Sequence, residues 1–180
     1  MRVFIGCSAY DSIALKYKDL ACSVSEVLAK RGDKLVFGGS DTGMMYKCYQ
    51  TFRYHNSKIK AINDIKWIDI LKGMEYDREE ITPTTFERCK NLYLSSELIV
   101  ILPGGIGTLS ELMGMVEEKR TRGDNIDIIV FNLDGFYDDY FSLMKKLREE
   151  GFVHEDEGIM KLVKVVKTMD EFIKVIERRN

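Results

Sequence analysis

The chain has 180 residues, of which 45% are hydrophobic, and this size and composition are typical of one globular domain with a single core. Its 27 basic and 29 acidic side chains give a net charge of −2, so no excess of positive charge attracts it to nucleic acid or to an anionic membrane. We therefore expect a single domain over residues 1–180 that uses no nucleic acid and no membrane as a partner.

The cysteines favour a reduced environment. Cys7, Cys22, Cys48 and Cys89 form no C-x-x-C pair, and the first residues lack the charged and apolar regions of a secretory signal. We expect free thiols in a cytoplasmic protein rather than a disulfide framework. The longest apolar run, Leu98–Leu102, is far shorter than the ~20 residues that span a bilayer.

Short apolar, β-branched runs recur along the chain, and each is followed by turn residues and then by a helical pattern. The expected strands are Val3–Ile5, Leu35–Phe37, Ile59–Ile62, Leu98–Leu102, Ile128–Phe131 and Leu162–Val166. This alternation predicts β-α-β units, and hence an α/β fold with a doubly wound, mostly parallel sheet flanked by helices. In such a fold, ligands bind at the carboxyl edge of the sheet.

The first predicted helix follows the first strand, with Asp11 or Ser12 as its N-cap and Gly32 as its stop. The further expected helices are Gly43–Arg53, Thr84–Ser96, Thr108–Arg120, Tyr137–Glu150 and Met169–Arg178. Residues 64–81 give no clear pattern.

The most informative segment runs from Leu98 to Glu111, where a buried strand leads through Gly104, Gly105 and Gly107 directly into a helix. Glycines allow close approach of the backbone to a phosphate, and the free N–H groups of a helix start point at the anion. The loop lacks the lysine of a Walker A motif and the spacing of the dinucleotide motif G-x-G-x-x-G. It therefore favours a mononucleotide phosphate.

The same residues permit a purely structural interpretation. The glycines could form only a tight turn, and Thr108 with Glu111 has the Thr-x-x-Glu spacing of a capping box. In that case the carboxylate would fold back onto its own helix start and would take no part in chemistry.

Two other loops leave predicted strands and reach the same edge of the sheet. Residues 37–45 read Phe-Gly-Gly-Ser-Asp-Thr-Gly-Met-Met, and Gly6-Cys7-Ser8 follows the first strand. We include Ser8, Gly39 and Met45 among the candidate substrate-binding residues. The alternative is that these loops are ordinary strand-end turns and that Met44 and Met45 fill the core.

An arginine precedes the phosphate-loop strand. In the segment Pro83–Lys90, Thr84 and Glu87 could form a capping box, and Arg88 lies in the first turns of the helix that follows. Arg88 is either a surface ion-pair residue or a permanently charged group that faces a phosphate or a sugar.

Together these residues resemble the LOG family, the cytokinin-activating phosphoribohydrolases long mislabelled as lysine decarboxylases. The family signature Pro-Gly-Gly-x-Gly-Thr-x-x-Glu is complete at Pro103–Glu111, and the family's arginine, fifteen positions before that proline, falls on Arg88. The resemblance continues through the second glycine loop and through Asn132–Tyr137 and Glu149–Val153, so it covers nearly the whole chain.

The resemblance implies a three-layer, Rossmann-like fold and a homodimer. It also implies hydrolysis of the N-glycosidic bond of a nucleoside 5′-monophosphate, such as AMP, to free base and ribose 5-phosphate, with no metal and no organic cofactor. The small-molecule nucleotide would be held at its 5′-phosphate by Gly104, Gly105, Gly107 and Thr108. Glu111 and Arg88 would carry catalysis.

This chemistry is physically reasonable, because breaking the C1′–N bond builds oxocarbenium character on the ribose. A nearby carboxylate stabilises that charge or orients water against it. Arg88 could hold the ribose or the phosphate and fix Glu111. The acid that protonates the leaving base is unassigned, since His55 and His154 lie in no motif.

The chain departs from the family pattern at several positions. The family's Met-x-x-Arg-Lys reads Thr85-Phe-Glu-Arg88-Cys89, and the second glycine loop carries Ser40 and Tyr46 where relatives have glycine. Beyond Glu111 a charged run, Glu117–Gly123, is typical of a solvated helix face. These changes leave open a second hypothesis, a non-catalytic nucleotide-binding sensor or carrier of the same fold. An amino-acid decarboxylase would need pyridoxal phosphate on a lysine, and no lysine lies in a recognisable site for it.

Overall fold

The structure is a computed structural model that describes residues 1–71, 73–154 and 159–178. Within these residues, seven parallel strands form one sheet in the order β4-β3-β2-β1-β5-β6-β7. The strands are β1 (Arg2–Gly6), β2 (Lys34–Phe37), β3 (Ile59–Asp64), β4 (Arg78–Thr82), β5 (Leu98–Ile101), β6 (Asp127–Phe131) and β7 (Val163–Val166). The predicted doubly wound α/β fold is thereby confirmed.

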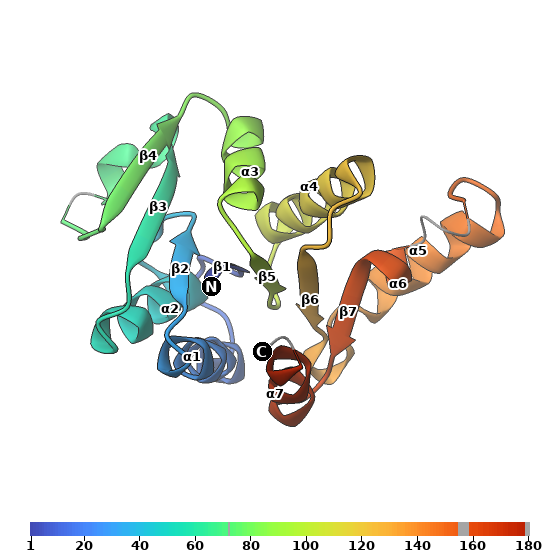
Figure 1. Ribbon diagram of the computed structural model, residues 1–180, viewed down its shortest axis with the longest axis horizontal. Coiled ribbons are helices and arrows are strands. Elements are labelled where there is room, and N and C mark those ends of the chain that lie inside the picture. The colour runs from blue at the N-terminus through green and yellow to red at the C-terminus, as the bar shows by residue number, and fades with distance from the viewer. Residues whose placement is uncertain (72, 155–158, 179–180) are drawn as a thin grey trace.

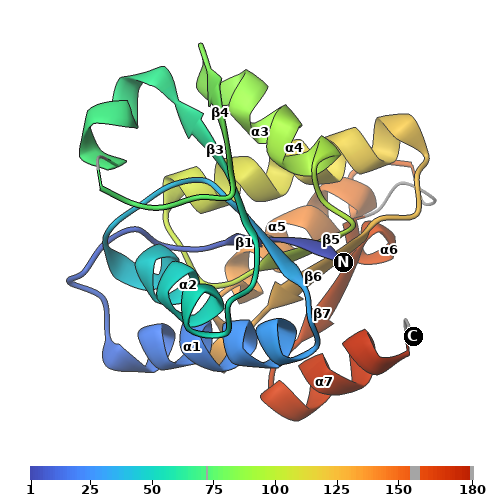
Figure 2. The ribbon, with the colours of Figure 1, turned by 60° about the vertical axis from the view of Figure 1, so that its left-hand side comes forward.

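Helices cover both faces of the sheet (Figures 1 and 2). They are α1 (Leu15–Lys30), α2 (Gly43–Tyr54), α3 (Thr85–Leu94), α4 (Ile106–Arg122), α5 (Asp138–Glu149), α6 (Ile159–Leu162) and α7 (Met169–Glu177), with short 3₁₀ helices η1 (Ile65–Leu71) and η2 (Leu133–Gly135). The side chains of α1, α2 and α7 pack on one face, and those of α3, α4 and α5 pack on the other. Among the described residues, no helix combines the length and apolar composition needed to cross a membrane.

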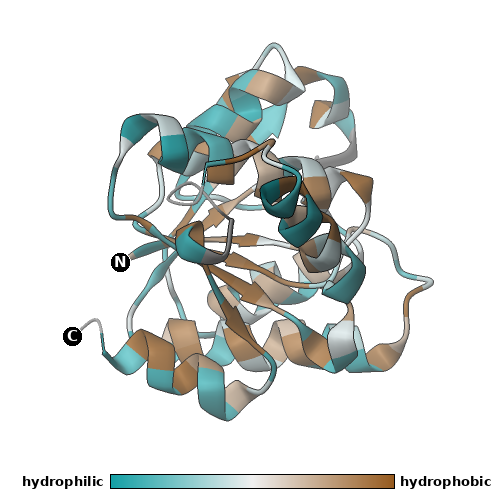
Figure 3. Ribbon diagram, turned by 90° about the vertical axis from the view of Figure 1, so that its right-hand side faces the viewer, coloured by the Kyte–Doolittle hydropathy of each residue, from teal (hydrophilic) through white to brown (hydrophobic). Residues whose placement is uncertain are grey.

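The two faces follow from the alternation of side chains along each strand. In β1, Val3 and Ile5 join the core under α1 and α2, whereas Phe4 joins the core under α3 and α4. The central strands are therefore apolar on both sides, as buried parallel strands require, and Figure 3 shows them as hydrophobic ribbons enclosed by helices of mixed character.

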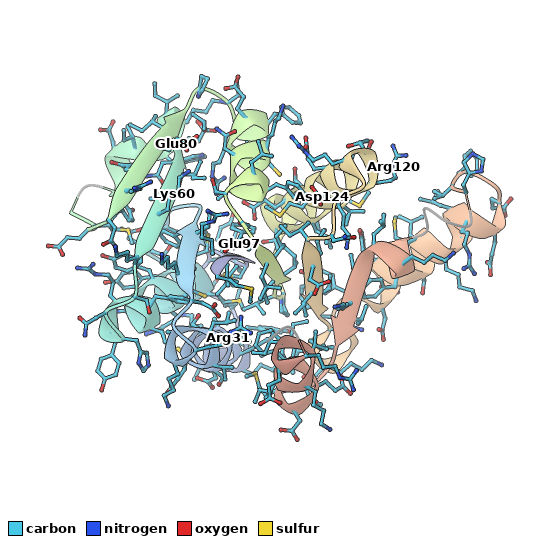
Figure 4. All side chains as sticks on the ribbon, in the orientation of Figure 1. Arg31, Lys60, Glu80, Glu97, Arg120 and Asp124 are labelled. Atoms are coloured by element: carbon cyan, nitrogen blue, oxygen red, sulfur yellow. The ribbon has the colours of Figure 1, made fainter. Side chains whose placement is uncertain are left out.

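Strand β4 was missing from the sequence prediction, because its sequence, Arg-Glu-Glu-Ile-Thr, has no apolar run. It forms the edge of the sheet, and polar pairs attach it there: Lys60 Nζ lies 2.8 Å from Glu80 Oε2, and Asn63 Nδ2 donates to Glu79 Oε1 at 2.7 Å. Figure 4 labels Lys60 and Glu80 at this edge. Charged edge strands are common because they oppose pairing with other chains.

The start of α1 corrects a prediction. The helix begins at Leu15 with Ala14 as its N-cap, and neither Asp11 nor Ser12 caps it. Asp11 instead accepts a hydrogen bond from the backbone N–H of Gly43, the first residue of α2, at 3.1 Å and pairs with Lys18 at 3.0 Å. The carboxylate therefore joins the first two strand-to-helix loops rather than starting the nearer helix.

Candidate functional site

The exposed start of α4 with the loop before it, residues 104–107, lies at the carboxyl edge of the sheet, and we call it the cradle. β5 ends at Ile101, and α4 begins at Ile106 with Gly105 as an N-cap that supplies no side chain. Gly105, Ile106 and Gly107 are exposed. An exposed helix start without a side-chain cap presents its N–H groups and the positive end of its dipole to an anion.

The capping-box interpretation of Thr108 and Glu111 is wrong, because Thr108 is the third residue of α4 and not its N-cap. The buried Thr108 side chain packs against Gly104, where a β-carbon would overlap it. Residue 104 therefore has to be glycine for the loop to fold over the helix start. By contrast, Thr84 does cap α3, since its side chain accepts a hydrogen bond from Glu87 N.

Glu111 and Arg88 meet beside this cradle, although they come from different helices. Arg88 Nη2 lies 3.3 Å from Glu111 Oε1, and each side chain is 15% exposed. Arg88 is therefore not an ordinary surface ion-pair residue. The adjoining helices α3 and α4, which carry the two residues, are visible in Figures 1 and 2.

Two further contacts fix the guanidinium of Arg88. Its Nε donates to the carbonyl oxygen of Ile62 in β3 at 3.3 Å. Its Nη2 lies against Gly38, at the carboxyl end of β2, where a β-carbon would overlap it. The helix that carries Arg88 is held in turn by Asp64, whose Oδ2 accepts a hydrogen bond from the Thr85 hydroxyl at 2.7 Å.

Asp64 is a carboxylate that the sequence analysis missed. It is 1% exposed, and hydrogen bonds from Lys66 N and Thr85, reinforced by the charge of Arg88, lower its pKa. The predicted strand ended at Ile62, whereas β3 extends to Asp64. Asp64 therefore fell in the unassigned segment, and no motif singled it out. The charged form of Asp64 stabilises the start of α3 and therefore the position of Arg88.

The carboxyl group of Glu111 lies in a largely dehydrated setting. Burial raises its pKa above the ordinary value, and the charge of Arg88 opposes that shift. Its Oε2 lies 3.4 Å from the place where a β-carbon of Gly6 would stand, at the end of β1. A carboxylate in such a place is available to face a developing positive charge.

The second glycine loop packs against the loop after β1. Met45 N donates to the carbonyl oxygen of Ser8 at 3.2 Å, and Gly43, with φ +65°, approaches the Ala9 carbonyl so closely that a β-carbon would overlap it. Gly39 also has a positive φ of 80°. The three predicted loops therefore do converge on one edge of the sheet.

Both methionines of this loop are buried in the core, as the packing alternative predicts. Met44 also lines a pocket, and the side chain of Met45 reaches toward Gly38. The side chains of Ser40 and Tyr46 make local contacts. Ser40 Oγ hydrogen-bonds to Thr42 Oγ1, and the ring of Tyr46 stacks on that of Tyr49, with centroids 6.0 Å apart.

A pocket of about 240 Å³ adjoins the cradle on the side of α1. We define the aromatic pocket by the lining residues Ser8, Tyr10, Tyr17, Gly104, Gly105 and Phe136. Ser8 and the two glycines were candidate site residues, but the three aromatic residues were not. The sequence alone does not single them out, because isolated aromatic residues in loops and on helices are as typical of core packing as of a binding site.

Several other residues that the sequence analysis discussed do not line the aromatic pocket. Cys89, at the position of the family's lysine, packs on α4, and its pKa is raised to about 11 by burial. His55 caps the far end of α2. The charged run on α4 forms surface ion pairs, Glu117 with Arg120 and Glu118 with Arg122. In the part of the chain that the structure describes, no three His, Cys, Asp or Glu side chains gather as metal ligands would.

Known proteins share both the sequence pattern and the fold. Residues 38–176 match the family model described as "Possible lysine decarboxylase". The chain is 28% identical over 152 residues to cytokinin riboside 5′-monophosphate phosphoribohydrolase LOG1 of Arabidopsis thaliana, covering 84% of this chain and 70% of that protein. It is 27% identical over 160 residues to cytokinin riboside 5′-monophosphate phosphoribohydrolase LOG of Oryza sativa subsp. japonica, covering 86% of this chain and 64% of that protein.

Among solved structures, the fold is similar to that of the molybdenum cofactor binding protein from the phototrophic bacterium Rippkaea orientalis, with a TM-score of 0.73 and 17% identity over 99% of this chain and 96% of that one. This likeness concerns the fold. The match of the family model over most of the sequence, which includes Arg88 and the complete loop from Pro103 to Glu111, shows that the chain belongs to the "Possible lysine decarboxylase" family, which is the LOG family.

Proposed function

We propose that the chain hydrolyses the N-glycosidic bond of a nucleoside 5′-monophosphate, releasing the free base and ribose 5-phosphate. The observation that carries the proposal is the placement of the Glu111 carboxylate. It is largely buried, paired with Arg88 and turned toward the strand ends, one and a half turns of helix beyond the exposed cradle at Gly105. Relatives named as phosphoribohydrolases of cytokinin riboside 5′-monophosphates support the same reaction class.

In the proposed reaction, the N–H groups at the start of α4 hold the 5′-phosphate. This binding fixes the sugar, so that remote binding energy positions the reacting carbon. The C1′–N bond breaks, a water oxygen bonds to C1′, and the proton that water gives up balances the one gained by the leaving base. Glu111 stabilises the oxocarbenium character that develops on the ribose.

Arg88 has two functions in this proposal. Its charge opposes the rise in the pKa of Glu111 that burial causes. Its guanidinium, held by the Ile62 carbonyl, also limits the rotamers of the carboxylate. A group held from three sides loses little entropy when the substrate binds.

The test is incubation with a panel of monophosphates of adenine, guanine, cytosine, uracil and 2′-deoxyadenosine, with free base measured by chromatography. We expect base and ribose 5-phosphate in equal amounts from at least one substrate. Glu111→Gln should abolish release while nucleotide binding persists. Glu117→Gln, on the exposed face of the same helix, is the matched control and should leave turnover unchanged.

A carrier or sensor of the same fold is the competing interpretation, and the Cys89 and Tyr46 departures are consistent with it. Tight nucleotide binding, with the ligand recovered intact and no base from any substrate, would support the carrier and contradict the hydrolase. A decarboxylase on pyridoxal phosphate finds no support in the site, since the described residues that line the aromatic pocket include no lysine.

A further inference from the structure

The aromatic pocket is a preformed cavity with an apolar interior. Tyr17 and Phe136 pack edge to face, with centroids 5.8 Å apart. Lys16 lies 5.1 Å from the centroid of the Tyr17 ring and pairs with Asp134 at 2.8 Å, which ties α1 to η2. Ser8 Oγ accepts a hydrogen bond from Tyr10 N at 3.1 Å. These contacts hold the rings of Tyr17 and Phe136 in place as walls of the pocket.

The chemistry of the walls suits a flat, weakly polar ring. Apart from Ser8 and the two tyrosine hydroxyls, the side chains that line the pocket are apolar. Phosphate and ribose need polar partners for their oxygens, which these walls supply poorly. The volume of about 240 Å³ is smaller than the ~300–1,000 Å³ of pockets that enclose a whole drug-sized ligand. It therefore suits one ring system rather than a complete nucleotide.

The pocket adjoins the cradle. Gly104 and Gly105 form part of its wall, and Gly105 is also the N-cap of the cradle. Ser8, which also lines the pocket, is two residues from Gly6, where a β-carbon would lie 3.4 Å from Glu111 Oε2. Two residues of extended chain span at most ~7 Å. A nucleotide with its phosphate at the cradle and its sugar at Glu111 can therefore place its base in the aromatic pocket.

We propose that the aromatic pocket is the base subsite of the nucleotide hydrolase, and that Tyr10, Tyr17 and Phe136 recognise the base by stacking on its faces. This inference rests on the proposed function. Every base has a π-face, so stacking discriminates weakly among bases. The site accepts purine and pyrimidine monophosphates with similar affinity, and the 5′-phosphate with its ribose, rather than the base edge, defines the substrate class.

The test compares a ligand that has a base with one that lacks it. Dissociation constants of AMP and ribose 5-phosphate are measured by calorimetry on Tyr10→Ala and Phe136→Ala, each combined with Glu111→Gln so that AMP stays intact. Tyr54→Ala, which removes another exposed tyrosine far from the pocket at the end of α2, is the matched control. Circular dichroism confirms the fold of each variant.

Base–aromatic stacking contributes ~1–3 kcal/mol per base, so we expect AMP to bind at least about fivefold more weakly to both alanine variants. Ribose 5-phosphate should bind with unchanged affinity, Tyr54→Ala should alter neither ligand, and Tyr10→Phe should restore AMP binding. The inference fails if both ligands weaken equally, if neither weakens, or if AMP does not bind at all.

The outcome is separable from that of the hydrolase proposal, because turnover is measured on the wild-type chain. Selective loss of AMP binding without base release from the wild type would leave the base subsite standing and overturn the hydrolase. Base release by the wild type, without a selective loss of AMP binding in the alanine variants, would support the hydrolase and overturn the base subsite. A preference greater than about 100-fold between AMP and UMP would contradict recognition by stacking alone.

Discussion

The guanidinium of Arg88 occupies the space in which a β-carbon at position 38 would lie. Gly38 directly follows the last residue of β2, and Arg88 belongs to α3, fifty residues further along the chain. Because Gly38 has no side chain, the guanidinium of Arg88 can occupy this position. The ion pair of Arg88 with Glu111 therefore depends on a third position that contributes no side chain.

Gly38→Ala should displace the guanidinium from Glu111 without unfolding the chain. Misplacement of a catalytic group by about 1 Å can cost ~100-fold in rate, so we expect kcat/KM for a nucleoside monophosphate to fall roughly 10- to 100-fold. The check is a double-mutant cycle with Arg88→Ala. If Gly38 acts through Arg88, Gly38→Ala should change little in the Arg88→Ala background, and additive losses would contradict this role.

Gly107→Ala should stabilise the fold and at the same time weaken the binding of phosphate and AMP. A β-carbon at Gly107 meets no heavy atom within 4 Å, and alanine is favoured over glycine in a helix by ~0.5–1 kcal/mol. We expect the free energy of unfolding to rise by about that amount while phosphate and AMP bind more weakly, because the methyl group obstructs the cradle. Denaturant titration and calorimetry measure the two effects.

Gly114→Ala, in the same helix, provides the contrast. Its β-carbon would lie 2.9 Å from Cys89 Sγ, between α3 and α4, so we expect a loss of stability of ~1–3 kcal/mol from overpacking. A Gly107→Ala variant that binds phosphate and AMP as tightly as the wild type would argue against the cradle.

The pKa of Glu111 predicts a pH dependence of activity. Burial raises that pKa above the ordinary 4.5, so the carboxylate becomes protonated at a higher pH than an exposed glutamate does. As the pH falls through the raised pKa, the ionised form is lost and kcat/KM should decrease. An acidic limb at or below pH 4.5 would contradict the assignment.

Stability should change in the opposite direction. The folded state holds the Glu111 proton more tightly than the unfolded state does, so the contribution of this group to the free energy of unfolding falls as the pH rises from 4.5 through the folded-state pKa. Glu111→Gln removes this ionisation. Its stability relative to the wild type should therefore increase over that range, as measured by urea titration at several pH values.

Tyr137 links the start of α5 to the loop between β5 and α4. Its hydroxyl donates to the carbonyl oxygen of Leu102 at 2.7 Å in a buried setting, and its N–H donates to Asn132 Oδ1 at 2.7 Å. Tyr137→Phe leaves the Leu102 carbonyl without that donor, so we expect a loss of ~1–3 kcal/mol of stability and weaker AMP binding. Tyr54→Phe, at an exposed site, should change neither. Unaltered unfolding and binding in Tyr137→Phe would contradict this role.

The sequence was most informative where the physical cause is local. Continuous apolar runs in β1, β2, β5 and β6 identify buried strands, because side chains of a strand alternate between its faces and both faces of these strands are covered. The glycines from Gly104 to Gly107 identify the cradle because a helix start needs only its own backbone to offer N–H groups. In contrast, the side chains that join β4 to β3 form an ion pair and a polar hydrogen bond, which leave no apolar pattern to read.

The amino-acid sequence by itself determined the class of fold and the glycine-rich start of α4, since each depends on neighbours along the chain. The tertiary structure alone decided that Arg88 reaches Glu111 past Gly38, that Asp11 serves α2 rather than α1, and that Tyr10, Tyr17 and Phe136 enclose one pocket. Those relationships join segments separated by tens of residues. They exist only after the crossovers have brought the carboxyl ends of the strands to a common edge.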